Sequence, residues 1–242
     1  MAGRNALVEA LRESVPVLRV YVAERLDHDD RVREVLKLAA VRRLPILEVP
    51  RPELDRLTEG AVHQGVAARL APYDYADALE VVASARARGE LPLLVALDSV
   101  TDPRNLGAVI RSAAAFGCHA VVVPERRAAT MTAGAWKASA GAAARVPVAR
   151  AANLTRELRG LQEAGLTIVG LDAAADSPIG DLDLTGEPLV LVVGSEGRGL
   201  SRLVRESCDV LAAIPMTAAT ESLNAGVAAG IALYEVARRR TP

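Results

Sequence analysis

At 242 residues, with 29 basic and 30 acidic side chains, the chain is long enough for one or two domains and carries a formal net charge of −1. This balance excludes a protein that binds nucleic acid by bulk positive charge, and an aromatic content of 2% excludes RNA binding through a sheet of stacked aromatic rings. No apolar run approaches the ~18 residues that span a bilayer, and the first residues lack the apolar stretch of a signal peptide, so we expect a cytoplasmic protein with no membrane partner.

Residues 1–72 are predicted to form a small α/β domain. Apolar runs at 18–22, 45–49 and 65–70 are typical of strands, and helical apolar spacing covers 29–42 and, more briefly, 53–57. Pro72-Tyr73-Asp74-Tyr75 interrupts this pattern, and a helical stretch at 76–88 ends before Gly89, which suits a helix C-terminus. We therefore place a domain boundary near Pro72 and assign 73–92 to a linker and connecting helix.

Residues 93–242 predict a second α/β domain. The runs at 93–97, 120–123, 167–171 and 189–193 are short and nearly continuously apolar, which is typical of parallel strands buried on both faces. Helices are expected at 103–116 with Asp102 as N-cap, at 154–164 with Asn153 as N-cap, and at about 222–239. This alternation predicts a doubly wound parallel sheet.

Three polar clusters follow apolar runs in this second domain. The first is Asp102-Pro103-Arg104-Asn105-Leu106-Gly107 with Arg111, the second is the glycine loop from Gly194 to Ser201, and the third is Thr220-Glu221-Ser222-Leu223-Asn224. Ligands of α/β folds bind where the carboxyl ends of parallel strands meet, at one edge of the sheet. The three clusters therefore predict one composite site.

Single members of these clusters also have ordinary structural interpretations. Asn105 could supply only a turn hydrogen bond, Glu196 could be a solvated turn residue, and Ser222 could be the N-cap of the last helix. Asn224 in the first turn of that helix is harder to dismiss. Arg111 interrupts an otherwise apolar helix and needs a carboxylate or a phosphate as partner.

Metal and disulfide chemistry are not indicated. Cys118 and Cys208 are far apart and match no metal or redox spacing, so we expect two small buried thiols. None of the three histidines has a partner at metal-ligand spacing, and we expect no metal site.

The clusters resemble the three motifs of the SpoU branch of the SPOUT RNA methyltransferases, also called the TrmH family. The matching segments are 97–113, 191–200, and 214–216 followed by 221–224 and 228–235. The front domain, through Gly3-Arg4-Asn5-Ala6-Leu7 and Val62-His63-Gln64-Gly65-Val66, looks like the substrate-binding domain of RlmB-type members. One departure is that Ala225-Gly226 stands where family members often carry Val-Ser, which we expect to alter helix packing rather than chemistry.

The resemblance implies the fold and the activity. It implies a SPOUT domain with a parallel sheet and a deep trefoil knot, against the general rule that chains are unknotted, preceded by a small α/β substrate-binding domain. It also implies S-adenosylmethionine as cofactor and a homodimer whose site is completed at the subunit interface. RlmB-type enzymes methylate the ribose 2′-hydroxyl of a guanosine in the peptidyl-transferase region of 23S rRNA, and we expect that reaction here.

The resemblance also implies roles for individual residues. The catalytic cluster would be Asn105, Arg111, Glu196, Ser222 and Asn224. The cofactor would be held, largely through backbone groups, at Gly194, Ile214, Met216, Ser222 and Leu223. Candidates for RNA phosphate contacts, each equally explained as a solubilising surface charge, are Arg104, Arg126, Arg127, Lys137, Arg145 and Arg198. The family's counterpart of Arg111 is assigned as the base, but a guanidinium is almost never neutral, so we expect Arg111 to bind a phosphate and stabilise negative charge instead.

Other functions compete with this one. The same chemistry could act on tRNA, or on an antibiotic-binding rRNA nucleotide as a resistance factor. A non-catalytic ribosome-assembly RNA-binding protein is a further alternative, against which the five catalytic candidates argue together. A nicotinamide-dependent Rossmann enzyme is disfavoured because no glycine fingerprint follows a first strand.

Overall fold

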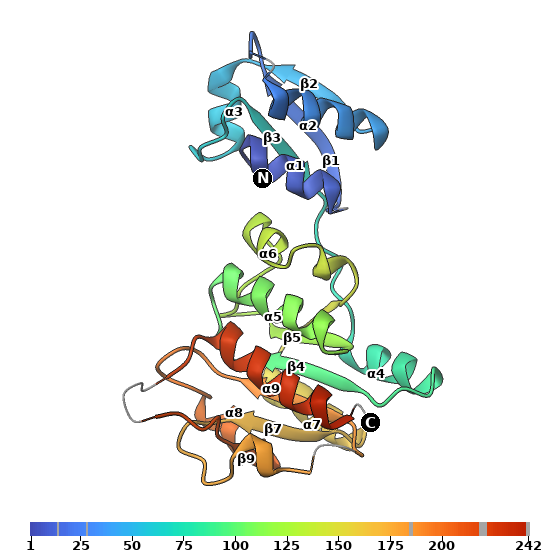
Figure 1. Ribbon diagram of the computed structural model, residues 1–242, viewed down its shortest axis with the longest axis vertical. Helices are drawn as coiled ribbons and strands as arrows, with labels where there is room; N and C mark the ends of the chain where they lie inside the picture. Colours follow the sequence, from blue (N-terminus) through green and yellow to red (C-terminus); the bar gives the residue numbers. More distant parts are fainter. Residues whose placement is uncertain (14, 28, 184–185, 218–221, 241–242) are drawn as a thin grey trace. The chain divides into compact units, whose positions relative to one another are not determined.

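The computed structural model describes residues 1–13, 15–27, 29–183, 186–217 and 222–240. The chain divides into two compact units, Met1–Tyr73 (unit 1) and Asp74–Pro242 (unit 2) (Figure 1). Among the helices in the described ranges, none is long and apolar enough to cross a membrane.

Unit 1 is a three-stranded sheet with helices on both faces. Its elements in chain order are α1 (Arg4–Arg12), β1 (Val17–Ala23), α2 (Asp30–Val41), β2 (Ile46–Val49), α3 (Arg51–Leu57) and β3 (Val66–Leu70). The strand order is β2-β1-β3, with β1 parallel to β2 and antiparallel to β3. The three strands and two helices predicted from the sequence are confirmed.

The two faces of this sheet are covered unequally. Val20 and Val22 of β1 pack with α1 and α2 in a core of eleven buried residues. On the opposite face, Leu54 of α3 packs against Ala23 and Ala67. The sheet therefore separates a larger apolar core from a smaller one.

Helix α1 was not predicted, because its sequence carries no capping side chain. Gly3 precedes the helix at a φ of 98° and makes no side-chain cap. The backbone N–H of Arg4 instead donates to Gln64 Oε1 at 3.1 Å, from a residue 60 positions away in the chain. The free backbone N–H at the start of the helix is thus satisfied by a residue distant in sequence rather than by a neighbouring capping side chain.

Unit 2 is a six-stranded, wholly parallel sheet with the order β6-β5-β4-β8-β7-β9. The strands are β4 (Leu93–Leu97), β5 (Ala120–Pro124), β6 (Val148–Ala151), β7 (Thr167–Leu171), β8 (Leu189–Val193) and β9 (Val210–Ala212). The helices are α4 (Ala78–Ala87), α5 (Pro103–Ala115), α6 (Ala133–Ala138), α7 (Leu154–Glu163), α8 (Arg202–Glu206) and α9 (Ala225–Arg240), with short 3-10 turns η1 (Ala142–Ala144) and η2 (Ile179–Asp181).

Helices cover both faces of this sheet, as expected for a doubly wound fold. Residues of α4 and α7 pack on one face, with Val82, Leu158 and Leu161 in the same core as the strand residues Leu94 and Val190. Helices α5 and α9 lie side by side on the other face (Figure 1). The predicted α/β fold is confirmed; the trefoil knot implied by the resemblance stays a prediction.

Two strands, two short helices (α6 and α8) and one helix boundary in unit 2 differ from the sequence expectation. β6 and β9 were not predicted because they are short and, in β6, interrupted by Arg150, which lies over the Tyr75 ring at 3.7 Å. The last helix begins at Ala225 rather than at Ser222. Asp102 and Asn153 cap α5 and α7 as predicted, accepting from Arg104 N and Arg156 N.

The order of the strands fixes where a site can form. From β4 the chain moves outward through β5 and β6, and it then returns to build β7, β8 and β9 on the other side. A crevice is expected where this direction reverses, at the carboxyl ends of β4 and β8. Asp98, buried directly after β4, accepts from Ser201 N at 2.6 Å and ties the two strand ends together.

The two thiols are expected to be chemically inert in the folded protein. Burial raises the pKa of Cys118 to about 12 and that of Cys208 to about 11, so little thiolate forms at pH 8. Iodoacetamide at that pH should alkylate both cysteines at least about 100-fold more slowly than in the unfolded chain. Intact-mass spectrometry over time measures this, and rapid modification of either folded thiol would contradict it.

Candidate functional site

The glycine loop after β8 closes on itself. Ser195 and Gly199 exchange backbone hydrogen bonds at 3.1 and 2.9 Å, and Gly197 and Gly199 adopt positive φ values of 75° and 65°. At Gly194 an added Cβ would lie 2.1 Å from the carbonyl carbon of Gly199. The loop therefore requires glycine at 194, and it presents Glu196 at its exposed tip.

Glu196 joins the other two polar clusters in one hydrogen-bonded group. Its Oε1 accepts from Asn105 Nδ2 at 2.8 Å and from Asn224 Nδ2 at 2.6 Å. Asn224 Nδ2 also donates to Asn105 Oδ1 at 3.0 Å. We call these three residues the amide–carboxylate cluster. It brings together residues from all three sequence clusters, which were predicted to meet.

Asn224 has a second role that fixes its amide. Its Oδ1 accepts from Gly226 N at 3.0 Å and Val227 N at 3.2 Å, so Asn224 is the N-cap of α9. The prediction that Asn224 lies inside the first helical turn, and the alternative that Ser222 caps the helix, are both wrong. Because the oxygen faces two N–H donors, the Nδ2 group must face Glu196 and Asn105.

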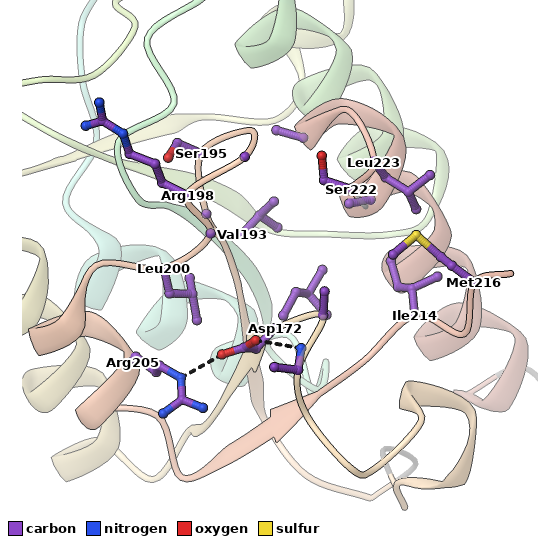
Figure 2. Close-up of a pocket in the computed structure, with 18 residues that line it drawn as sticks. Asp172, Val193, Ser195, Arg198, Leu200, Arg205, Ile214, Met216, Ser222 and Leu223 are labelled. Atoms are coloured by element: carbon purple, nitrogen blue, oxygen red, sulfur yellow. Dashed lines mark hydrogen bonds and ion pairs between the residues drawn. The ribbon is translucent and has the colours of Figure 1, made fainter. Parts of the chain in front are cut away.

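A pocket of about 420 Å³ lies beside the cluster, between the loops that follow β7, β8 and β9 and the start of α9 (Figure 2). All five residues predicted to hold the cofactor line it: Gly194, Ile214, Met216, Ser222 and Leu223. In Figure 2 the side chains of Ile214, Met216 and Leu223 lie across the pocket from Val193 and Leu200. Glu221, which belongs to the third family motif, lies outside the described residues.

The sequence missed one charged pair in this pocket. Asp172, directly after β7, accepts from Arg205 Nε at 2.6 Å and from Ala174 N at 2.9 Å. The Arg205 guanidinium, and then the Ala174 N–H, hold the pKa of Asp172 below its ordinary value. Asp172 is the first polar residue after a predicted strand, which is the signal that could have identified it.

Arg111 does not join the cluster within this chain. It is exposed on α5 and has no hydrogen-bond or ion-pair partner among the residues that the structure describes. Six residues along a helix separate it from Asn105 by about 9 Å in rise and about 120° in rotation. We predicted a carboxylate or a phosphate as partner of Arg111, and no carboxylate within the described ranges takes that role.

The RNA-contact candidates are all exposed. Arg104, Arg126, Arg127, Arg145 and Arg198 have no side-chain partner in the described part of the chain. Arg104, Arg126, Arg127 and Arg198 follow the carboxyl ends of β4, β5 and β8, whereas Arg145 lies just before β6, where the chain has returned to the opposite edge of the sheet. Lys137 is exposed on α6.

Among the described residues, no group of three or more His, Cys, Asp or Glu side chains is placed to hold a metal ion.

Family comparisons cover nearly the whole chain. Residues 92–234 match the model of the SpoU rRNA Methylase family, and residues 2–76 match the model for RNA 2′-O ribose methyltransferase substrate binding. A relative from Mycobacterium sp. (strain KMS), named as an uncharacterised tRNA/rRNA methyltransferase, is 56% identical over 238 residues, covering 98% of this chain and 76% of that protein.

Solved structures agree in fold over both units. The SpoU methyltransferase AviRb from Streptomyces viridochromogenes, in complex with the cofactor AdoMet, has a TM-score of 0.72 and 28% identity, covering 99% of this chain and 89% of its own. An AdoMet-bound rRNA methyltransferase from Sinorhizobium meliloti has a TM-score of 0.69 and 25% identity, covering 100% and 87%.

Proposed function

We propose that this chain methylates a ribose 2′-hydroxyl of RNA. The premise is that it belongs to the SpoU family of S-adenosylmethionine-dependent RNA methyltransferases. The amide–carboxylate cluster beside the pocket is the observation that carries this proposal. The match of unit 1 to a substrate-binding domain of RNA 2′-O ribose methyltransferases supports the ribose as acceptor. As the target we propose a guanosine in the peptidyl-transferase region of 23S rRNA, from the resemblance to RlmB-type members.

The pocket fits S-adenosylmethionine in size and chemistry. Its volume is in the range of small-molecule sites, and its walls combine apolar side chains with the Asp172 carboxylate. A loop that tolerates only glycine at 194 lets backbone groups come close to a ligand. We assign donor binding to Gly194, Ile214, Met216, Ser222 and Leu223. When bound, the donor supplies a methyl group already activated by its sulfonium.

The protein must then orient the ribose and manage its proton. Glu196 accepts two amide N–H groups through one oxygen, so its side chain is held toward α5 and the start of α9. The cluster thereby fixes the glycine loop against both helices. We propose that Asn105, Glu196, Ser222 and Asn224 position the 2′-hydroxyl next to the donor pocket.

Arg111 would act across a subunit interface. Its exposed guanidinium, which has no partner in the described part of the chain, suits the phosphate next to the target ribose and can stabilise negative charge developing on the 2′-oxygen. Because Arg111 does not reach the cluster of its own chain, we propose that a homodimer places it at the site of the other subunit. The candidate arginines at the same sheet edge would bind neighbouring phosphates.

Arg111→Lys distinguishes phosphate binding from base catalysis. We expect kcat to fall about tenfold, because lysine keeps the charge and loses the bidentate contact, and to stay flat between pH 7 and 9. Methyl transfer from labelled donor under single-turnover conditions measures this. A kcat that climbs with pH around the ordinary pKa of lysine would show instead that position 111 supplies the base.

The function is tested by methyl transfer from labelled S-adenosylmethionine to unmodified 23S rRNA, 16S rRNA and bulk tRNA, followed by nucleoside analysis. A 2′-O-methylguanosine product confined to 23S rRNA is the expected result. Label in tRNA, or on another 23S nucleotide such as one at an antibiotic site, would keep the chemistry and overturn the target. Donor binding without transfer to any RNA or ribosomal particle would favour a non-catalytic RNA-binding protein.

A further inference from the structure

We propose that Arg19 and Arg69 in unit 1 form a binding site for the phosphodiester groups of RNA. This inference rests on the proposed function in one respect, namely that the substrate is RNA. It assigns to a pair of residues outside the methyl-transfer site the task of holding the substrate backbone.

The two arginines lie directly opposite each other on neighbouring strands. β1 and β3 are antiparallel, and their register pairs Arg19 with Arg69 and Tyr21 with Ala67. Side chains alternate between the faces of a sheet, so both arginines share the face of Tyr21 and Ala67. That is the face on which Leu54 of α3 packs against Ala23 and Ala67, and on it Arg19 is half-buried and Arg69 is exposed. Paired residues in this position carry their Cβ atoms about 4.5–5.5 Å apart, so both guanidinium groups can reach one anion.

The pair is electrostatically unfavourable as it stands. Like charges directly opposite each other on a sheet destabilise it. Neither arginine side chain has a hydrogen-bond or ion-pair partner within the described residues, and Arg19 Nε is buried without an acceptor. A buried donor left unsatisfied costs free energy that an incoming anion would recover.

Six other arginines of unit 1 have acceptors within the same domain. Ion pairs join Arg4 to Asp29, Arg12 and Arg31 to Glu34, Arg33 to Asp30, and Arg56 to Glu53. Arg42 donates to three backbone carbonyls. Arg19 and Arg69 have no such acceptor among the described residues, and unlike Arg25, Arg43 and Arg51, which also have none, they lie opposite each other on neighbouring strands.

The surroundings favour a nucleotide chain over a free ion. Leu47 of β2 lies beside Tyr21 on the same face and is 39% exposed. An anion bound by the arginines would thus lie next to apolar surface, which suits a phosphate that carries a sugar and a base. Two arginine forks are also the side chains best matched to a phosphate in geometry.

The test uses the full-length chain and a fluorescently labelled oligouridylate, read by anisotropy over a series of salt concentrations. Arg69→Glu is expected to weaken binding about tenfold and to lower the slope of log K against log salt by about 0.7 per lost phosphate contact. The same variant should keep or raise Tm, because a glutamate opposite Arg19 replaces repulsion with attraction. A purely structural arginine would instead lower Tm and leave the slope unchanged.

Arg33→Glu is the matched control. It makes the same charge change on α2, which packs on the other face of the sheet, at an exposed arginine already paired with Asp30. If Arg69→Glu binds the oligonucleotide as Arg33→Glu does, the proposal is wrong. It is also wrong if inorganic phosphate displaces the oligonucleotide at equal phosphate concentration, since the site would then recognise the free ion.

Oligonucleotide binding and methyl transfer test the arginine site and the proposed function separately. Oligouridylate contains no guanosine and is not the proposed methylation substrate, so its binding decides the role of the arginine pair independently. Unchanged binding in Arg69→Glu with normal methyl transfer would remove only the arginine site. Arginine-dependent binding without methyl transfer to any RNA would keep that site and remove the proposed reaction.

Discussion

Replacing Glu196 with glutamine is expected to lower kcat for methyl transfer by about 100-fold while leaving donor affinity within a few-fold of wild type. Glutamine keeps the size of the side chain and one oxygen for the two amide donors, but it removes the charge that strengthens both hydrogen bonds. Glu196 does not line the pocket that we propose binds the donor, which separates the two effects. Single-turnover transfer and calorimetric donor binding measure them.

Glu206→Gln is the matched control, since Glu206 pairs with Arg202 on α8, away from the cluster. It should change neither quantity. Wild-type turnover in Glu196→Gln would mean that the carboxylate charge is not needed, and the assignment of the cluster to catalysis would have to be withdrawn. If donor affinity fell by as much as kcat, the substitution would instead act by disturbing the pocket.

Gly194→Ala is expected to weaken donor binding by at least about 100-fold, and to lower Tm by several degrees. The new methyl group would lie within 2.5 Å of three backbone atoms of Gly199 and Leu200, which cannot move aside as a flexible side chain can. The loop must open, which breaks the paired hydrogen bonds between Ser195 and Gly199 and reshapes the pocket wall. Calorimetry with S-adenosylmethionine and thermal unfolding read the two effects.

The control for this substitution is Gly160→Ala on α7. An added Cβ there meets nothing within 4 Å, so alanine should leave donor binding unchanged and raise Tm slightly through its better helix propensity. Tight donor binding by Gly194→Ala would show that the loop has another conformation with room for a side chain. The closed loop would then not be the form that holds the donor.

The sequence predicted those parts of the fold whose signals are local. Strand β8 is a continuous apolar run, and α5 follows an aspartate that caps it, so both could be located without the structure. Helix α1 could not, because its start is held by Gln64 from the far end of unit 1. Local pattern carries no information on a cap supplied across such a distance.

The residues of the candidate site also divide into those that the sequence predicted and those that it did not. Asn105, Glu196 and Asn224 were predicted to meet because each follows a strand at one sheet edge and belongs to a family motif. The ion pair of Asp172 and Arg205 was not predicted, because neither residue belongs to a motif; the position of Asp172 directly after a predicted strand marks that residue alone, and the fold supplies its partner. The separation of Arg111 from Asn105 was not predicted, although their six-residue spacing in a predicted helix already turns the two side chains about 120° apart.

Position 224 must meet two structural requirements that asparagine satisfies together. Helix α9 needs a side-chain oxygen there, which serine, threonine or aspartate would supply as well. Glu196 and Asn105 need an N–H donor at the same place, which only a side-chain amide of that length provides. A change from asparagine to any other good capping residue would preserve the helix and abolish the junction of the three loops. Drift at this position would therefore yield a chain that folds normally and has lost its site.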